Sequence, residues 1–202
     1  MMRRCLRALL WLVSAAGLVG AIRQRHEAQQ VRRGELPPAG ATADVACRVI
    51  YSNVAARLAD WVPAPPPTPA QQLIARIWSA PLTAIGFVVA YAAGSRPHWR
   101  QDEQCYLAEN AGGLSGTLLR FVGADANTIG RVVISTQPTT SKALFAHEVV
   151  HVRQAERLGP LMVPLYLLLA ARYGYRDHPL ERAARLGARR AMPNSTPIRE
   201  TP

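Results

Sequence analysis

Cysteine is scarce in this chain, with three residues among 202. Cys5, Cys47 and Cys105 are too widely spaced to match a metal knuckle, which excludes the cysteine-rich zinc folds. Cys5 also precedes the first apolar run, so it is wrongly placed for a lipoprotein site. Cys47 and Cys105 leave two interpretations open: one disulfide in an oxidising compartment, or two buried free thiols.

Acidic residues and lysine are also scarce. The sequence has 13 acidic against 24 basic residues, a net charge of +11, and Lys142 is its only lysine. A chain this basic could bind nucleic acid, but its arginines form no dense patch with interleaved aromatic residues. They cluster instead beside apolar stretches, at residues 3–7, 23–33 and 172–190. This placement favours an anionic membrane surface over nucleic acid as a partner.

Long apolar runs are few, and one lies near the start of the sequence. Residues 8–22 carry no charge, and Arg3, Arg4 and Arg7 precede them. A run of about 15 residues after a basic start is typical of a signal peptide or a short signal anchor. We therefore expect residues 1–33 to be one of these two, and whether the run is cleaved stays open.

A second uncharged run covers residues 77–94, with Arg76 before it and Arg96 after it. Its length of about 18 residues just suffices for a helix to cross a bilayer. The pattern predicts a membrane-inserted helix over residues 71–96, and with it a location at a bacterial inner membrane, on a side left open. A buried core helix or an interfacial hairpin is the alternative. The apolar run at 161–171 is too short to span and favours a core helix behind the motif described below.

The remaining segments outside the motif are short. Residues 34–70 are expected to form a short helix and a stiff proline-rich linker, and residues 191–202 a disordered tail. The β-branched run at 131–135 is the firmest strand prediction. The segments expected to be strands or short helices are 104–107, 117–122 and 129–135, with a turn at 124–127.

The sequence contains one HExxH motif, running from His147 through Glu148 to His151. Thr139, Thr140 and Ser141 offer N-caps, and Gly159-Pro160 offers a stop, so residues 142–158 are expected to be helical. Residues four apart share a helix face, so both imidazoles can point at one ion. Two such histidines bind Zn²⁺, and the glutamate takes a proton from the metal-bound water. The alternative is two core or surface histidines without a metal.

A catalytic zinc needs a third protein ligand. Asp177, His178 and Glu181 lie downstream, and Pro179 can open a helix that places Glu181 in its first turn. We expect Glu181 to be the ligand, with His178 as second choice. The alternative role of Glu181 is a solvated charge that pairs with a neighbouring arginine.

This spacing resembles the gluzincin branch of the zincin metallopeptidases, in which a glutamate on a second helix follows HExxH. More closely, residues 147–185 resemble small bacterial membrane-associated HExxH proteins that have no established substrate. The resemblance rests on His151-Val152-Arg153-Gln154, Gly159-Pro160-Leu161, Tyr166-Leu167-Leu168-Leu169 and His178-Pro179-Leu180-Glu181. It implies His147 and His151 as ligands, Glu148 as general base and Glu181 as third ligand. The chain departs from the pattern at His178, where those proteins have asparagine.

We therefore expect an α+β fold. A minimal zincin-like domain over residues 97–190 would combine short antiparallel strands, the HExxH helix and a second ligand helix, with apolar helices before it. The expected function is a membrane-associated, zinc-dependent metallopeptidase that hydrolyses a peptide or protein substrate. Glu148 would be the base, and Tyr175, ahead of Tyr166 and Tyr173, would donate to the oxyanion. The alternatives are an inactive metal-binding membrane protein acting as a scaffold or binding module, and an arginine-based binder of nucleic acid or anionic lipid. The oligomeric state stays open.

Overall fold

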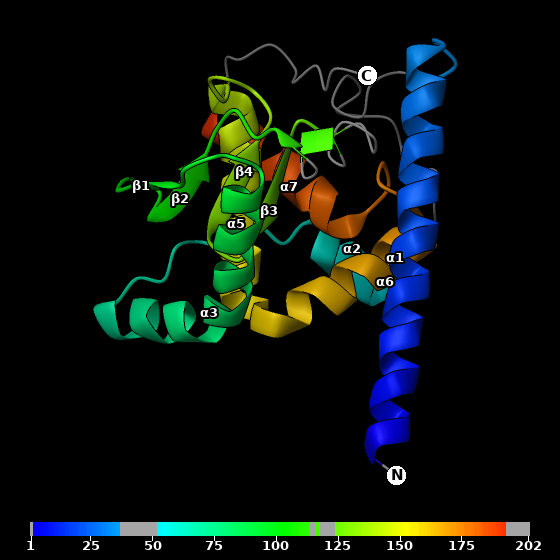
Figure 1. Ribbon diagram of the computed structural model, residues 1–202, viewed down its shortest axis with the longest axis horizontal. Coiled ribbons are helices and arrows are strands. Elements are labelled where there is room, and N and C mark those ends of the chain that lie inside the picture. Colours follow the sequence, from blue (N-terminus) through cyan, green and yellow to red (C-terminus); the bar gives the residue numbers. More distant parts are fainter. Residues whose placement is uncertain (1, 37–51, 114–115, 118–123, 193–202) are drawn as a thin grey trace.

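The structure is a computed structural model that describes residues 2–36, 52–113, 116–117 and 124–192, with side chains from residue 14 onward. Helices and strands are mixed along the chain, which confirms the α+β class (Figure 1). The elements are α1 (Met2–Arg32), α2 (Asn53–Ala59), α3 (Pro69–Ala92), β1 (His98–Arg100), β2 (Cys105–Ala108), β3 (Ala126–Ile129), β4 (Val132–Ser135), α5 (Lys142–Leu158), the 3₁₀ turn η1 (Gly159–Leu161), α6 (Met162–Tyr173) and α7 (Pro179–Ala191).

The four strands form a mixed sheet in the order β1-β2-β4-β3. β1 pairs with β2 and β3 pairs with β4 in antiparallel fashion, but β2 and β4 run parallel. The expectation of antiparallel strands throughout is therefore wrong for the central pair. After β2 the chain first crosses to the outer strand β3, and the hairpin that returns from β3 inserts β4 beside β2 in the parallel sense.

The turn of this hairpin lies later than the sequence suggested. β3 begins at Ala126, inside the predicted turn at 124–127, and the chain reverses at Gly130 and Arg131. Gly130 has φ +64°, which favours glycine. It therefore separates Ile129, the last residue of β3, from the strand predicted at 131–135, which β4 confirms over Val132–Ser135. Of the strand or short helix predicted at 117–122, Thr117 is helical and the rest lies outside the described residues.

Two helices cover the two faces of the sheet. Val132 and Ile134 face α3, whereas Val133, between them, packs with Val152 of α5. This alternation follows from the two-residue period of a strand. A Cβ on Gly86 of α3 would lie 2.5 Å from the carbonyl oxygen of Ile129, so α3 contacts the sheet backbone closely.

The first half of α3 follows a different course. Pro81 lies inside the helix, and Figure 1 shows that the helix turns sharply between its first half and the half that covers the sheet. A proline removes one backbone hydrogen bond and bends a helix at this point. Pro69, expected to end the linker, is instead the first residue of α3, after the N-cap Thr68.

Charged residues of α5 are also buried, on the side of the helix remote from the histidines. Glu156 forms ion pairs with Arg131 at 3.1 Å and with Arg153 at 2.9 Å. Arg153 also donates to the carbonyl of Glu103, so the cluster ties α5 to the β1–β2 connection. Cys105 lies beside it as a buried free thiol, and burial raises its pKa to about 12; Cys47 lies outside the described residues.

α1 crosses α6 at small residues. A Cβ on Gly20 would lie 3.0 Å from the Cβ of Ala170, so the two helices approach closely. Arg23 then donates to the carbonyls of Ala171 and Arg172, at 2.6 and 3.0 Å, and caps the end of α6. The earlier part of α1 extends away from the rest of the molecule (Figure 1). The second half of the predicted signal segment is thus part of the fold.

Candidate metal centre

The HExxH helix has the expected bounds, Lys142–Leu158, because its end signals act locally. The Ser141 hydroxyl accepts from the backbone N–H of Leu144 at 3.2 Å and caps the first turn. Gly159 ends the helix with φ +54°, and a Cβ there would lie 2.4 Å from the indole nitrogen of Trp78. The helix is thus fixed at both ends.

Three buried side chains converge between α5 and α7. The Nε2 atom of His147 lies 3.1 Å from Oε2 of Glu181, and Nε2 of His151 lies 3.2 Å from Oε1. One ligand atom from each residue lies within 4.8 Å of the others, so the group could hold a metal ion. Two imidazole nitrogens and one carboxylate oxygen fit the donor set of a zinc site.

His178 positions this group without joining it. Its Nδ1 accepts from the backbone N–H of Leu180 at 3.2 Å, which caps α7, and its Nε2 donates to the carbonyl of Tyr166 at 3.0 Å. Burial lowers the pKa of His178 to about 4, so the ring is neutral and holds one proton for the second bond. Pro179 then starts α7, and Glu181 falls in its first turn as predicted.

The charges of His151 and Glu181 stabilise each other. Burial alone would lower the pKa of His151, but the negative charge of Glu181 and its hydrogen bond outweigh it and raise that pKa to about 9. Burial likewise favours the neutral form of Glu181, yet the two histidines hold the pKa of its carboxyl well below the usual range. Without a metal, the site therefore contains a buried imidazolium–carboxylate pair at neutral pH.

Gln154 fixes the ring of His151. Its side-chain oxygen lies 2.9 Å from Nδ1 of His151, and its amide nitrogen donates to the carbonyl of Leu180 at 3.4 Å. The Nδ1 proton is held by this oxygen, so Nε2 is left for Glu181 or for a metal. Sequence reasoning did not assign Gln154 a role, although its position three residues after a candidate ligand was a usable signal.

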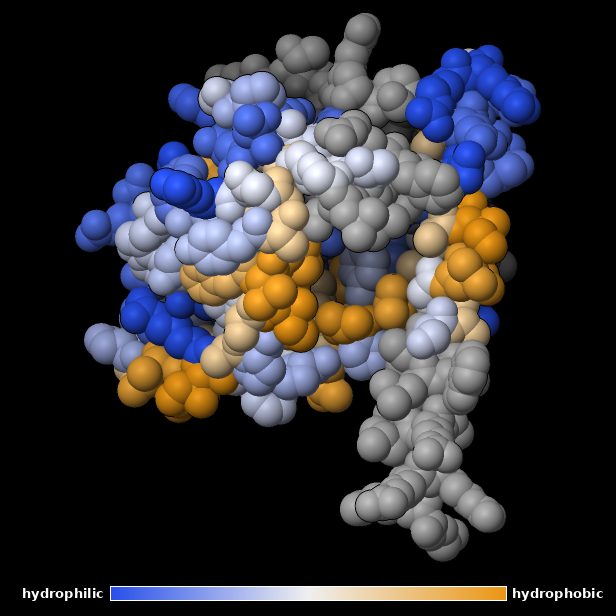
Figure 2. Space-filling model, in the orientation of Figure 1, coloured by the Kyte–Doolittle hydropathy of each residue, from blue (hydrophilic) through white to orange (hydrophobic). Residues whose placement is uncertain are grey.

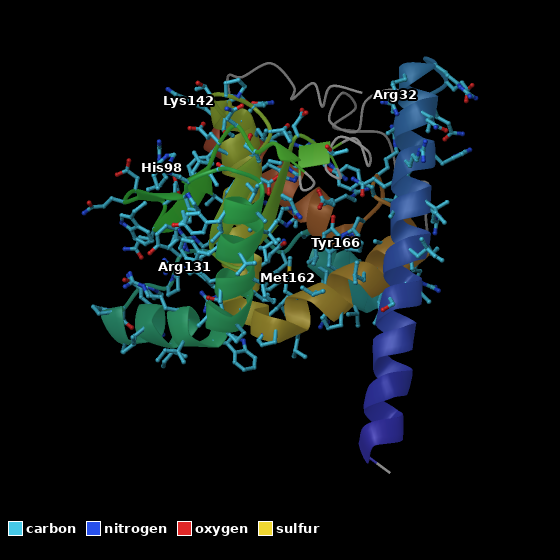
Figure 3. The ribbon with its side chains drawn as sticks, in the orientation of Figure 1. Arg32, His98, Arg131, Lys142, Met162 and Tyr166 are labelled. Carbon is cyan, nitrogen blue, oxygen red and sulfur yellow. The ribbon has the colours of Figure 1, made fainter. Side chains whose placement is uncertain are left out.

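The three candidate tyrosines lie at different positions relative to the metal group. The Tyr166 hydroxyl donates to Oε1 of Glu181 at 2.7 Å, and Figure 3 shows Tyr166 on α6, in the same helix as Met162. Burial, followed by the charge of Glu181, raises the Tyr166 pKa well above its usual value. Tyr175 lines the cavity beside the group, whereas Tyr173 is buried elsewhere.

Glu148 is buried and points to the same cavity. Its carboxylate accepts a hydrogen bond of 2.7 Å from the hydroxyl of Thr128, which lies on β3. Thr128 was not predicted, because its segment was expected to be a turn and the start of another strand. β3 is the outer strand of the sheet on this side among the described residues, and it borders the cavity.

A cavity of about 440 Å³ opens beside the three-residue group. Its lining comes from α1, α3, β3, α5, α6 and α7, and Figure 2 shows a hollow between apolar residues of α1, α3 and α6. Most of the lining beyond the titratable residues is apolar; representative members are Leu82, Ile85, Met162, Val163 and Leu167, with Gln24 reaching in from α1. The arrangement can hold a metal, a base and an apolar ligand in one place.

Comparisons with known proteins found no match for this chain. No protein-family model matches the chain, no curated protein matches its sequence, and no solved structure matches its fold.

Proposed function

We propose that the protein is a membrane-associated, zinc-dependent metallopeptidase. The observation that supports this most is the convergence of His147, His151 and Glu181, with Glu148 at the adjoining cavity. Catalytic zinc sites use three protein ligands of this kind and keep one position open.

The residues around the group have separable roles. When bound, zinc supplies Lewis acidity, which lowers the pKa of water and polarises a carbonyl. Glu148 accepts the proton of the attacking water, and the Thr128 hydroxyl keeps the carboxylate turned towards the cavity. Gln154 and Tyr166 hold His151 and Glu181 in the orientation that binds the ion.

The substrate we propose is an extended peptide that pairs with β3. A strand at a sheet edge offers unpaired N–H and C=O groups, and peptides bind such edges by adding a strand. β3 carries Thr128 and borders the cavity, so a peptide there lies beside Glu148. Tyr175 lines the same cavity and is the proposed donor to the oxyanion. Tyr166 is engaged with Glu181 and is proposed to orient that ligand.

The membrane location has two supports. α3 is long and apolar enough to cross a membrane by length and composition, a test that the core helix of a soluble protein also passes. The uncharged run at 8–22 in α1 follows three arginines, and the part of α1 before its contact with α6 extends away from the fold. The alternative function is a scaffold without turnover. It is favoured by the ion pairs of Glu181, which satisfy the histidines even without a metal.

The variant Glu148→Gln tests the peptidase proposal. We expect purified protein to keep its zinc, measured by mass spectrometry, while hydrolysis of a mixed peptide library falls about 10²–10⁴-fold, since a general base contributes that much. Glu35→Gln, at an exposed residue with a 3.9 Å contact to Arg33, is the matched control and should keep both. Undiminished hydrolysis in Glu148→Gln would show that the base is wrong. A zinc-loaded wild type without any hydrolysis would favour the scaffold.

A further inference from the structure

The first half of α3 exposes its large apolar residues, unlike an amphipathic helix at the surface of a soluble protein. Between Pro69 and Pro81 its buried residues are the small Ala75 and Ser79. The large apolar residues point outward, and Ile74 and Ile77 are 65% and 66% exposed. An amphipathic helix on a soluble protein turns its large apolar residues inward.

Neighbouring elements extend this apolar surface. The Trp78 indole donates to the carbonyl of Arg157 at 3.3 Å, so the first half of α3 is fixed to the end of α5, next to η1. Figure 2 shows apolar residues on α1, α3 and α6 around the hollow. The exposed large apolar residues of this surface, here called the apolar seat, are Leu18, Val19 and Ile22 of α1, Leu73, Ile74, Ile77 and Trp78 of α3, and Leu161, Val163 and Leu168 of η1 and α6.

The charges on the α3 and α6 parts of the apolar seat have one sign. Arg76, Arg157 and Arg172 are exposed in α3, α5 and α6, and neither residues 69–80 nor residues 161–173 contain an acid. Large apolar residues exposed together on several helices mark a contact with a protein or a membrane. Two copies meeting through it would bring these arginines together, which opposes self-association. Anionic lipid headgroups complement them.

The path of α3 excludes a simple crossing. Each half on either side of Pro81 has about 12 residues and is about 18 Å long, well short of a hydrocarbon core of about 30 Å. The second half packs on the sheet through Gly86, in contact with Ile129 and Val132. A helix in this position cannot span a bilayer without taking the sheet into it.

We propose that the apolar seat rests in the surface of an anionic bilayer, with α3 lying flat and not crossing. Leu18, Val19 and Ile22 of α1 face the hydrocarbon together with the seat residues of α3 and α6, and exposed arginines contact headgroups. Because α1, α3 and α6 also wall the metal cavity, its substrate would be a peptide segment at the bilayer surface. The seat rests on the proposed membrane location and does not depend on peptidase activity.

The first experiment locates the two ends of α3 in the full chain. Gln71→Cys and His98→Cys are made in a background where Cys5 and Cys47 are serine, while Cys105 stays because it is fully buried. An impermeant maleimide is added to spheroplasts and, separately, to inverted inner-membrane vesicles. We expect both cysteines to react in the same one of the two preparations. Reaction of the two ends in opposite preparations would mean that α3 crosses, and would overturn the proposal.

The second experiment measures depth with nitroxide spin labels at Ile74 and Leu168, in vesicles of phosphatidylglycerol and phosphatidylethanolamine. Lys142, at the far end of the molecule in Figure 3, is the control. We expect both seat labels to collide with oxygen and to lose collisions with a nickel chelate, and the control to do the reverse. Nickel collisions like those of the control would overturn the proposal. So would protection from both reagents, which indicates a protein contact such as a second copy. Glu148→Gln should give the same pattern, so this result is separate from the peptidase test.

Discussion

Zinc binding should release a proton from His151. Because Glu181 raises the His151 pKa to about 9 in the metal-free protein, the ring is about 90% protonated at pH 8. A metal binds only the neutral imidazole, so that proton must leave. At its ordinary pKa of about 6.5, the same ring would hold only about 0.03 proton at this pH.

Isothermal titration calorimetry in buffers of different ionisation enthalpy counts the released protons. The matched variant is Glu181→Gln, which keeps the size of the side chain and removes the charge that raises the pKa. Burial remains and lowers the His151 pKa, whereas Glu148 and Gln154 still raise it, so the ring holds fewer protons at pH 8 than in the wild type. The wild type should therefore release more protons on binding zinc, by up to about 0.9.

The sign of the pH dependence follows from the same pKa. Below about pH 9 the proton competes with zinc, so the apparent zinc affinity should rise about tenfold per pH unit between pH 7 and 8.5. An equal proton count in wild type and Glu181→Gln would refute the charge coupling between His151 and Glu181. A flat affinity over this range would refute it independently.

Two further substitutions test positions away from the ion itself. His178→Ala should weaken zinc binding about 10–100-fold in a chelator competition, because it removes the α7 cap and the hydrogen bond to Tyr166. His178→Asn should restore most of the zinc affinity, because asparagine can still cap the helix. Equal losses of affinity in the two variants would contradict the positioning role. Gly130→Ala should lower the free energy of unfolding by about 3 kcal/mol or more, since φ is +64° and a Cβ would lie 2.4 Å from the backbone nitrogen of Thr83. Gly112→Ala, with no atom nearer than 3.8 Å, is the control and should change it by under about 1 kcal/mol in denaturant titrations; equal effects would exclude the clash.

The helices of the site could be predicted because their signals are local. Ser141 and Gly159 bound α5, and Pro179 opens α7 and places Glu181 in its first turn. Capping and proline geometry depend on residues a few positions apart, so one sequence contains them. The grouping of His147 with Glu181 then needs only that two such helices pack.

The sheet and the residues that it supplies could not be predicted in this way. The parallel pairing of β2 with β4 depends on the path of the connection, and the position of β3 depends on the turn at Gly130. Thr128 therefore went unnoticed as a partner of Glu148. The burial of Arg153 and Glu156 likewise depends on Arg131, which lies in the turn between β3 and β4, and helical periodicity does not report it.

The bonds from Arg23 to the end of α6 have a consequence for biosynthesis. They join residues 148 and 149 positions apart. During translation α1 is complete long before α6 leaves the ribosome, and at about 5–20 residues per second the delay is many seconds. For most of that time Gln24 and its helix have no cavity to wall, and α7, which carries Glu181, is made only after α6. The metal centre that we propose is therefore incomplete until α7 has been made. Before then it cannot hydrolyse its own nascent chain.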